Sequence, residues 1–131
     1  MIPAPAPGAT VSRERMLAWL VLAVALHSVA VGVALVLAPA WGVAFGGWGT
    51  ATPLFFVRQF GVFHFVVAAA YVVVFFKYRG VTILLTAKAI AVVSLVDALV
   101  RFGGPWAVGL AAVGDAAMGL AVWVLARHRA G

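Results

Sequence analysis

Four ionisable residues of this chain lie deep inside long apolar segments, where a titratable group is costly and marks a candidate site. They are His27, His64, Lys88 and Asp115. A helix rises about 1.5 Å per residue, which puts His27, His64 and Asp115 roughly 18–20 Å from the basic residues at one end of their segments. Lys88 lies about 13 Å deep by the same count. We therefore expect a buried polar cluster near the middle of a membrane.

These residue types are compatible with several kinds of chemistry. His27 and His64 on neighbouring helices could be the axial ligands of a haem b, with Gly32 and Gly61 leaving room for the macrocycle. Histidine and aspartate are also the usual parts of a proton or ion relay. The same groups could hydrogen-bond the head of a quinone or lipid held between helices. The simplest interpretation is that they join the helices to one another, and we favour it.

Three further charged residues lie toward the opposite ends of the apolar segments. Asp97 and Arg101 are four residues apart, which is the spacing of a helical ion pair. Arg58 lies near the start of its segment, where an arginine side chain can reach the membrane surface. We expect these three charges at the outer end of the molecule, separate from the cluster.

The composition requires a membrane around these segments. Hydrophobic residues make up 66% of the 131 residues, charged residues only 9%, and the mean hydropathy is +1.19. A soluble domain carries about 25% charged residues, so a soluble globule, a disordered chain and a nucleic-acid binder are excluded. The chain has no cysteine, which excludes disulfides and cysteine-bound metals. No catalytic motif appears, and we expect neither catalytic residues nor a metal site.

Four segments are each long enough to cross a membrane as a helix, which takes about 20 residues. They cover residues 16–38, 54–76, 81–100 and 105–126. Residues 1–15 are expected to be a flexible N-terminal tail, and residues 127–131 a C-terminal tail. Residues 39–53, rich in glycine and tryptophan, are expected to form an interfacial loop or a short amphipathic turn. The fold class is therefore an all-α antiparallel bundle of four transmembrane helices.

The basic residues predict the orientation of this bundle. Two of them, Arg58 and Arg101, fall on one side of the membrane. Six fall on the other side: Arg13, Arg15, Lys77, Arg79, Arg127 and Arg129. Because basic residues accumulate on the cytoplasmic side, both termini are expected in the cytoplasm of a plasma membrane.

The second half of the chain has a recognisable layout. It contains the run FFVRQFG at residues 55–61, Tyr71 late in the same segment, Lys88 in the next segment and Asp115 in the last. This layout resembles small bacterial four-helix membrane proteins of the DoxX-like type, over about residues 55–129. The first half lacks the arginine and glycine pattern of that group. The resemblance implies a four-helix bundle in a bacterial inner membrane and an accessory role, and it supplies no catalytic residue or substrate.

We thus expect a small integral membrane protein that acts as a non-enzymatic subunit or accessory protein. Its partners would be the lipid bilayer and either further copies of itself or a larger membrane complex, because four short spans enclose little volume. One alternative is an electron-transfer anchor that binds haem b through His27 and His64, or that holds a quinone or lipid. A second alternative is transport of protons, ions or small molecules by an oligomer.

Overall fold

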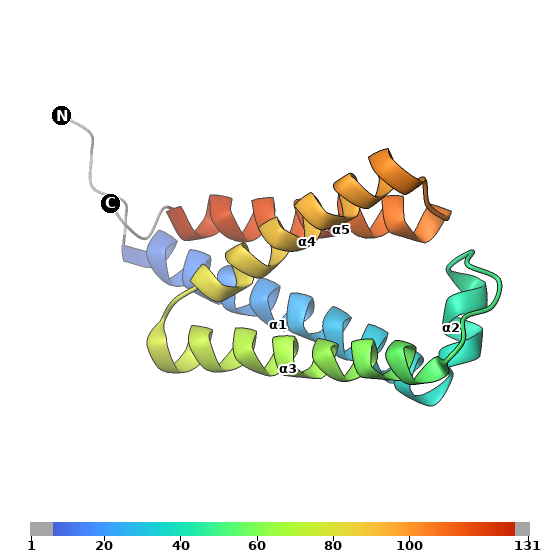
Figure 1. Ribbon diagram of the computed structural model, residues 1–131. Helices are drawn as coiled ribbons and strands as arrows, with labels where there is room; N and C mark the ends of the chain where they lie inside the picture. Colours follow the sequence, from blue (N-terminus) through green and yellow to red (C-terminus); the bar gives the residue numbers. More distant parts are fainter. Residues whose placement is uncertain (1–6, 128–131) are drawn as a thin grey trace.

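The computed structural model describes residues 7–127, and the side chains from residue 11 onward. The regular structure of this described part is entirely helical. Its elements are α1 (Pro7–Leu37), α2 (Pro39–Phe45), α3 (Leu54–Tyr78), α4 (Thr82–Phe102) and α5 (Trp106–Arg127), shown in Figure 1. All but α2 are long and apolar enough to cross a membrane. The predicted all-α class is confirmed, and four of the described helices could span a membrane.

The first helix begins earlier than its apolar segment. It starts at Pro7 rather than near Met16, so the segment with Arg13 and Arg15 is helical and not a flexible tail. Proline suits the first turn of a helix, and arginine, glutamate and methionine have high helix propensity. The basic segment therefore extends the apolar helix. Residues 1–6 and 128–131, which make up most of the remaining expected tails, lie outside the described residues.

The segment between the first two long helices forms a short helix and a tight turn. Helix α2 begins at Pro39 and ends at Phe45. Gly47 has a φ of 91°, a left-handed value that glycine adopts without strain. The Phe45 ring lies edge-to-face against Trp106 at the start of α5, with ring centroids 5.4 Å apart. The α2 segment thus reaches from α1 and α3 across to α5.

The long helices associate as two pairs. Helix α1 packs along α3, and α4 packs along α5, while fewer contacts join one pair to the other. Gly32 and Gly61 set the spacing of the first pair, because a Cβ at Gly32 would lie 2.8 Å from the carbonyl oxygen of Gly61. Such small residues let membrane helices approach until their backbones touch. In the second pair, a Cβ at Gly119 would lie 3.3 Å from the Cβ of Lys88.

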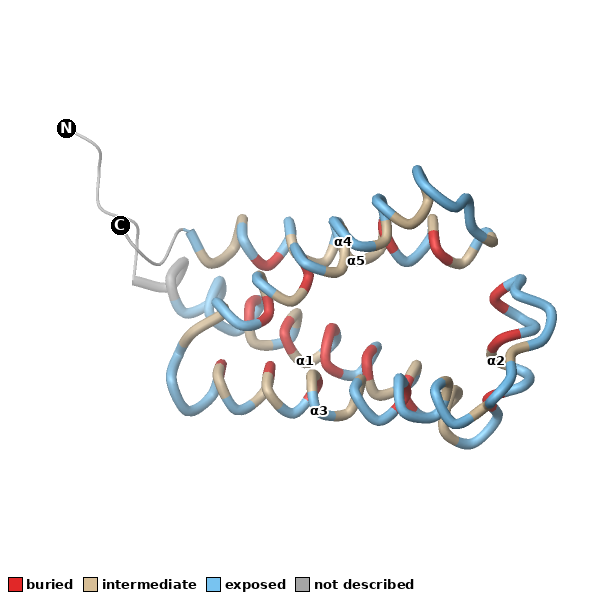
Figure 2. The backbone as a smooth tube through the Cα atoms, viewed as in Figure 1, coloured by how far each residue is buried: buried red, intermediate tan, exposed pale blue. Residues whose placement is uncertain are grey.

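The hydrophobic core that joins the two pairs occupies one half of the bundle. It consists of Leu17, Val21 and Val24 of α1, Tyr71 and Phe75 of α3, Leu84 of α4 and Val122 of α5. These residues come from the halves of the helices nearest the start of α1 and the end of α5, which lie at the same end of the molecule (Figures 1 and 2). Toward α2 the ribbons of the two pairs diverge (Figure 1).

Candidate polar site between the helix pairs

An ion pair joins α4 to α5 inside their apolar stretches. Lys88 Nζ donates a hydrogen bond to Asp115 Oδ1 at 2.5 Å. The two side chains are only 8% and 17% exposed. Gly119, one turn beyond Asp115, lets the backbone of α4 come close enough for this contact. The two charges neutralise each other where an isolated charge would be costly.

His64 lies on the inward face of α3. The buried residues of this helix, Gly61, Ala68, Tyr71 and Phe75, follow one face, and His64 falls on the same face at helical spacing. Its Nδ1 lies 3.0 Å from the backbone oxygen of Phe60. Because a carbonyl oxygen only accepts hydrogen bonds, Nδ1 is the donor, and in the neutral ring Nε2 keeps a lone pair. His64 is half-buried, so Nε2 is available to a hydrogen-bond donor on this face.

His27 brings α1 to the same level. It lies within electrostatic range of Lys88, Asp115 and His64. Its side chain is exposed, whereas Lys88 is buried and Asp115 is partly buried. The buried face of α1 continues past this point, because the next residue, Ser28, is only 4% exposed. His27 is exposed because it lies beside that face rather than on it.

Two more residues with polar groups are buried, one on α3 and one on α1. Tyr71 is 3% exposed and lies within electrostatic range of Asp115. Ser28 of α1 is 4% exposed, and it is a buried polar residue that our sequence analysis missed. The signal was present, because Ser28 continues the spacing of Val21 and Val24 along the buried face of α1.

The three outer charges stay apart from this site. Arg101 Nε donates to Asp97 Oδ1 at 2.7 Å, one turn away on α4, and both side chains are largely exposed. Arg58 of α3 is also exposed. It makes no ion pair with an acidic residue of the described chain. The structure therefore separates the polar residues of the site, which come from four helices, from a group of exposed charges on α3 and α4.

The haem interpretation does not fit this arrangement. A macrocycle between His27 and His64 would need the two helices held well apart, because both axial nitrogens face its iron. Gly32 and Gly61 instead bring the backbones of α1 and α3 into direct contact. The suggestion that these glycines make room for a porphyrin is wrong. In the part of the chain that the structure describes, no group of three or more potential ligands could hold a metal ion.

The described polar groups form a site suited to hydrogen bonding. It offers a neutral ion pair, the Nε2 lone pair of His64 and the exposed ring of His27. Comparison of this chain with known protein families, with curated proteins and with solved structures finds no match. The function proposed below therefore depends on the sequence and structure of this chain.

Proposed function

We propose that this protein is a small integral membrane protein that acts as a non-enzymatic subunit or accessory protein of a larger membrane assembly. The observation that supports this role is the poor coverage of α4. Only 11% of its apolar stretch is buried, compared with 28% for α1. Ile90, Val93 and Val100 lie on its outward face and are 62%, 69% and 80% exposed. A second copy or another membrane subunit would cover this face.

The proposed arrangement is an antiparallel bundle in a bacterial inner membrane, with both termini in the cytoplasm. The start of α1 and the end of α5 lie at the same end (Figure 1). The excess of lysine and arginine at that end supports the orientation. An accessory role is also what the DoxX-like resemblance of the second half implies.

Cysteine crosslinking in native membranes tests the subunit role. The natural chain has no cysteine, so it is the control for a Val93→Cys variant. We expect this variant to give one discrete crosslinked product under mild oxidation or with a short bifunctional maleimide. A product that contains two tagged copies identifies a homo-oligomer, and a product with a second polypeptide identifies a hetero-complex. A variant that stays monomeric in native membranes would contradict the proposal.

A second candidate function is the binding of a quinone or lipid head between the helix pairs. The observation that favours it is the free Nε2 of His64 near the exposed His27. That nitrogen can accept a hydrogen bond from a hydroxyl group, such as that of a quinol. The ligand would lie with its apolar tail among the membrane-facing side chains.

Thermal unfolding with a short-chain quinol tests this candidate. A ligand at about 100 times its Kd adds about 2.7 kcal/mol to the free energy of unfolding. We expect the quinol to raise the melting temperature of the natural chain and to have little effect on His64→Leu. Arg58→Gln, far from the site on the same helix, should respond like the natural chain. An equal shift in His64→Leu would show that the quinol binds elsewhere.

A further inference from the structure

The end of the bundle that holds the hydrophobic core also carries a concentration of positive charge. Its cations are Arg13 and Arg15 of α1, Lys77 and Arg79 at the end of α3, and Arg127 at the end of α5, and all are exposed. Glu14 is the one acidic residue of the described chain at this end. We call this group the basic end. At the opposite end Asp97 already pairs with Arg101.

Two of these cations rest on aromatic rings. The Arg127 guanidinium carbon lies 4.8 Å from the centre of the Trp123 ring. Lys77 Nζ lies 5.4 Å from the centre of the Tyr78 ring. A cation on a ring face is held in place by the ring's electrons. An arginine held in this way keeps the N–H groups at its edge free to bind an anion.

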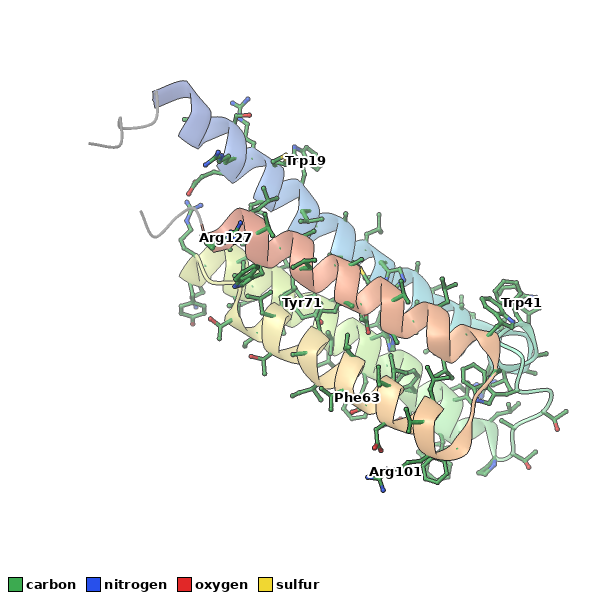
Figure 3. All side chains as sticks on the ribbon, turned by 90° about the horizontal axis from the view of Figure 1, so that it is seen from above. Trp19, Trp41, Phe63, Tyr71, Arg101 and Arg127 are labelled. Atoms are coloured by element: carbon green, nitrogen blue, oxygen red, sulfur yellow. The ribbon has the colours of Figure 1, made fainter. Side chains whose placement is uncertain are left out.

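The aromatic rings also indicate the depth of these cations. Trp19 is 72% exposed, and Tyr78 is 66% exposed. Figure 3 shows Trp19 and Arg127 toward the same end of the bundle, with Trp41 and Arg101 toward the other. Tryptophan and tyrosine settle at the level of the lipid headgroups. The cations therefore lie where the phosphates of a membrane surface lie.

We propose that the basic end binds the phosphate groups of anionic phospholipids, with Arg127 and Lys77 as principal ligands. Charge-assisted hydrogen bonds from guanidinium and ammonium groups to phosphate are strong and directional. The cations belong to three separate helix ends (Figure 1), which suits a sheet of headgroups better than a single small anion. This inference does not depend on the proposed subunit role.

Native mass spectrometry of the detergent-solubilised full chain tests this inference. The probes are phosphatidylglycerol and phosphatidylcholine with identical acyl chains, and inorganic phosphate alone. We expect the natural chain to prefer phosphatidylglycerol. Each cation near an anionic surface contributes about a fivefold change in affinity. Arg127→Gln should therefore bind phosphatidylglycerol about fivefold more weakly and phosphatidylcholine as before.

Matched variants distinguish binding at the basic end from a general effect of positive charge. Arg58→Gln removes one cation from the opposite end and should leave the preference unchanged, whereas Trp123→Leu should reduce it by removing the ring beneath Arg127. Circular dichroism of each variant should show unchanged helix content. Equal losses in Arg127→Gln and Arg58→Gln would overturn the proposal in favour of a general charge effect. Displacement of the lipid by millimolar inorganic phosphate would overturn it in favour of a soluble phosphate ligand.

Discussion

Replacement of Lys88 by methionine is expected to lower the free energy of unfolding by about 3 kcal/mol. The substitution keeps most of the apolar stem but leaves Asp115 without its partner at a site where only 17% of that side chain is exposed. An uncompensated charge in this setting costs far more than a lost surface contact. The measurement is reversible unfolding in mixed micelles titrated with SDS, followed by circular dichroism.

The double variant Lys88→Met/Asp115→Leu separates the cost of an orphaned charge from the value of the pair. Because it removes both charges, we expect it to recover most of the loss, to within about 1 kcal/mol of the natural chain. Asp97→Asn is the matched control. It breaks the exposed ion pair with Arg101, which should contribute only about 0.3–0.5 kcal/mol to the free energy of unfolding. If the double variant were as unstable as Lys88→Met, orphaned charge would not be the cause.

The second large loss of stability is expected when a glycine at the contact of α1 with α3 is replaced by alanine. A Cβ added at Gly61 would lie 2.9 Å from the carbonyl oxygen of Gly32. Backbone cannot move aside as a flexible side chain can, so the two helices must separate. We expect Gly61→Ala to lower the free energy of unfolding by about 1–3 kcal/mol, measured in the same SDS titration.

Two other glycines provide the control for this substitution. Gly109 and Gly114 of α5 have no atom within 4 Å of an added Cβ. Alanine at either position should be neutral or should stabilise the helix by up to about 1 kcal/mol, because alanine has the higher helix propensity. A loss at Gly109→Ala as large as that at Gly61→Ala would mean that close approach of α1 and α3 is not what the glycine provides.

Hydropathy was enough to predict the long helices, but not how they pair. The four apolar segments and their approximate ends follow from length and composition. Small residues occur on every span, so nothing in the pattern distinguishes the tight contact at Gly32 and Gly61 from a space left for a ligand. The start of α1 at Pro7 was missed because polar helix formers and a flexible tail look alike in a hydropathy profile.

For the polar site, residue spacing predicted the depth of the side chains along their helices, but not how far each is buried. Depth along the helices put His27, His64 and Asp115 at one level, and the structure places charges from α4 and α5 within electrostatic range of His27. The exposure of His27 follows from its place beside the buried face of α1, which Val21, Val24 and Ser28 define. Hydropathy alone does not identify which face of this apolar helix is buried.

The polar site is divided between the two helix pairs, which the hydrophobic core joins in only one half of the bundle. Lys88 and Asp115 both belong to the pair α4 and α5, so their ion pair lies within one pair. His27 and His64 both belong to the pair α1 and α3. At the end away from the core, the rings of Phe45 and Trp106, 5.4 Å apart, join the α2 segment to α5. A substitution that shifts one pair against the other should therefore change the distance from the histidines to the ion pair and leave the ion pair itself intact.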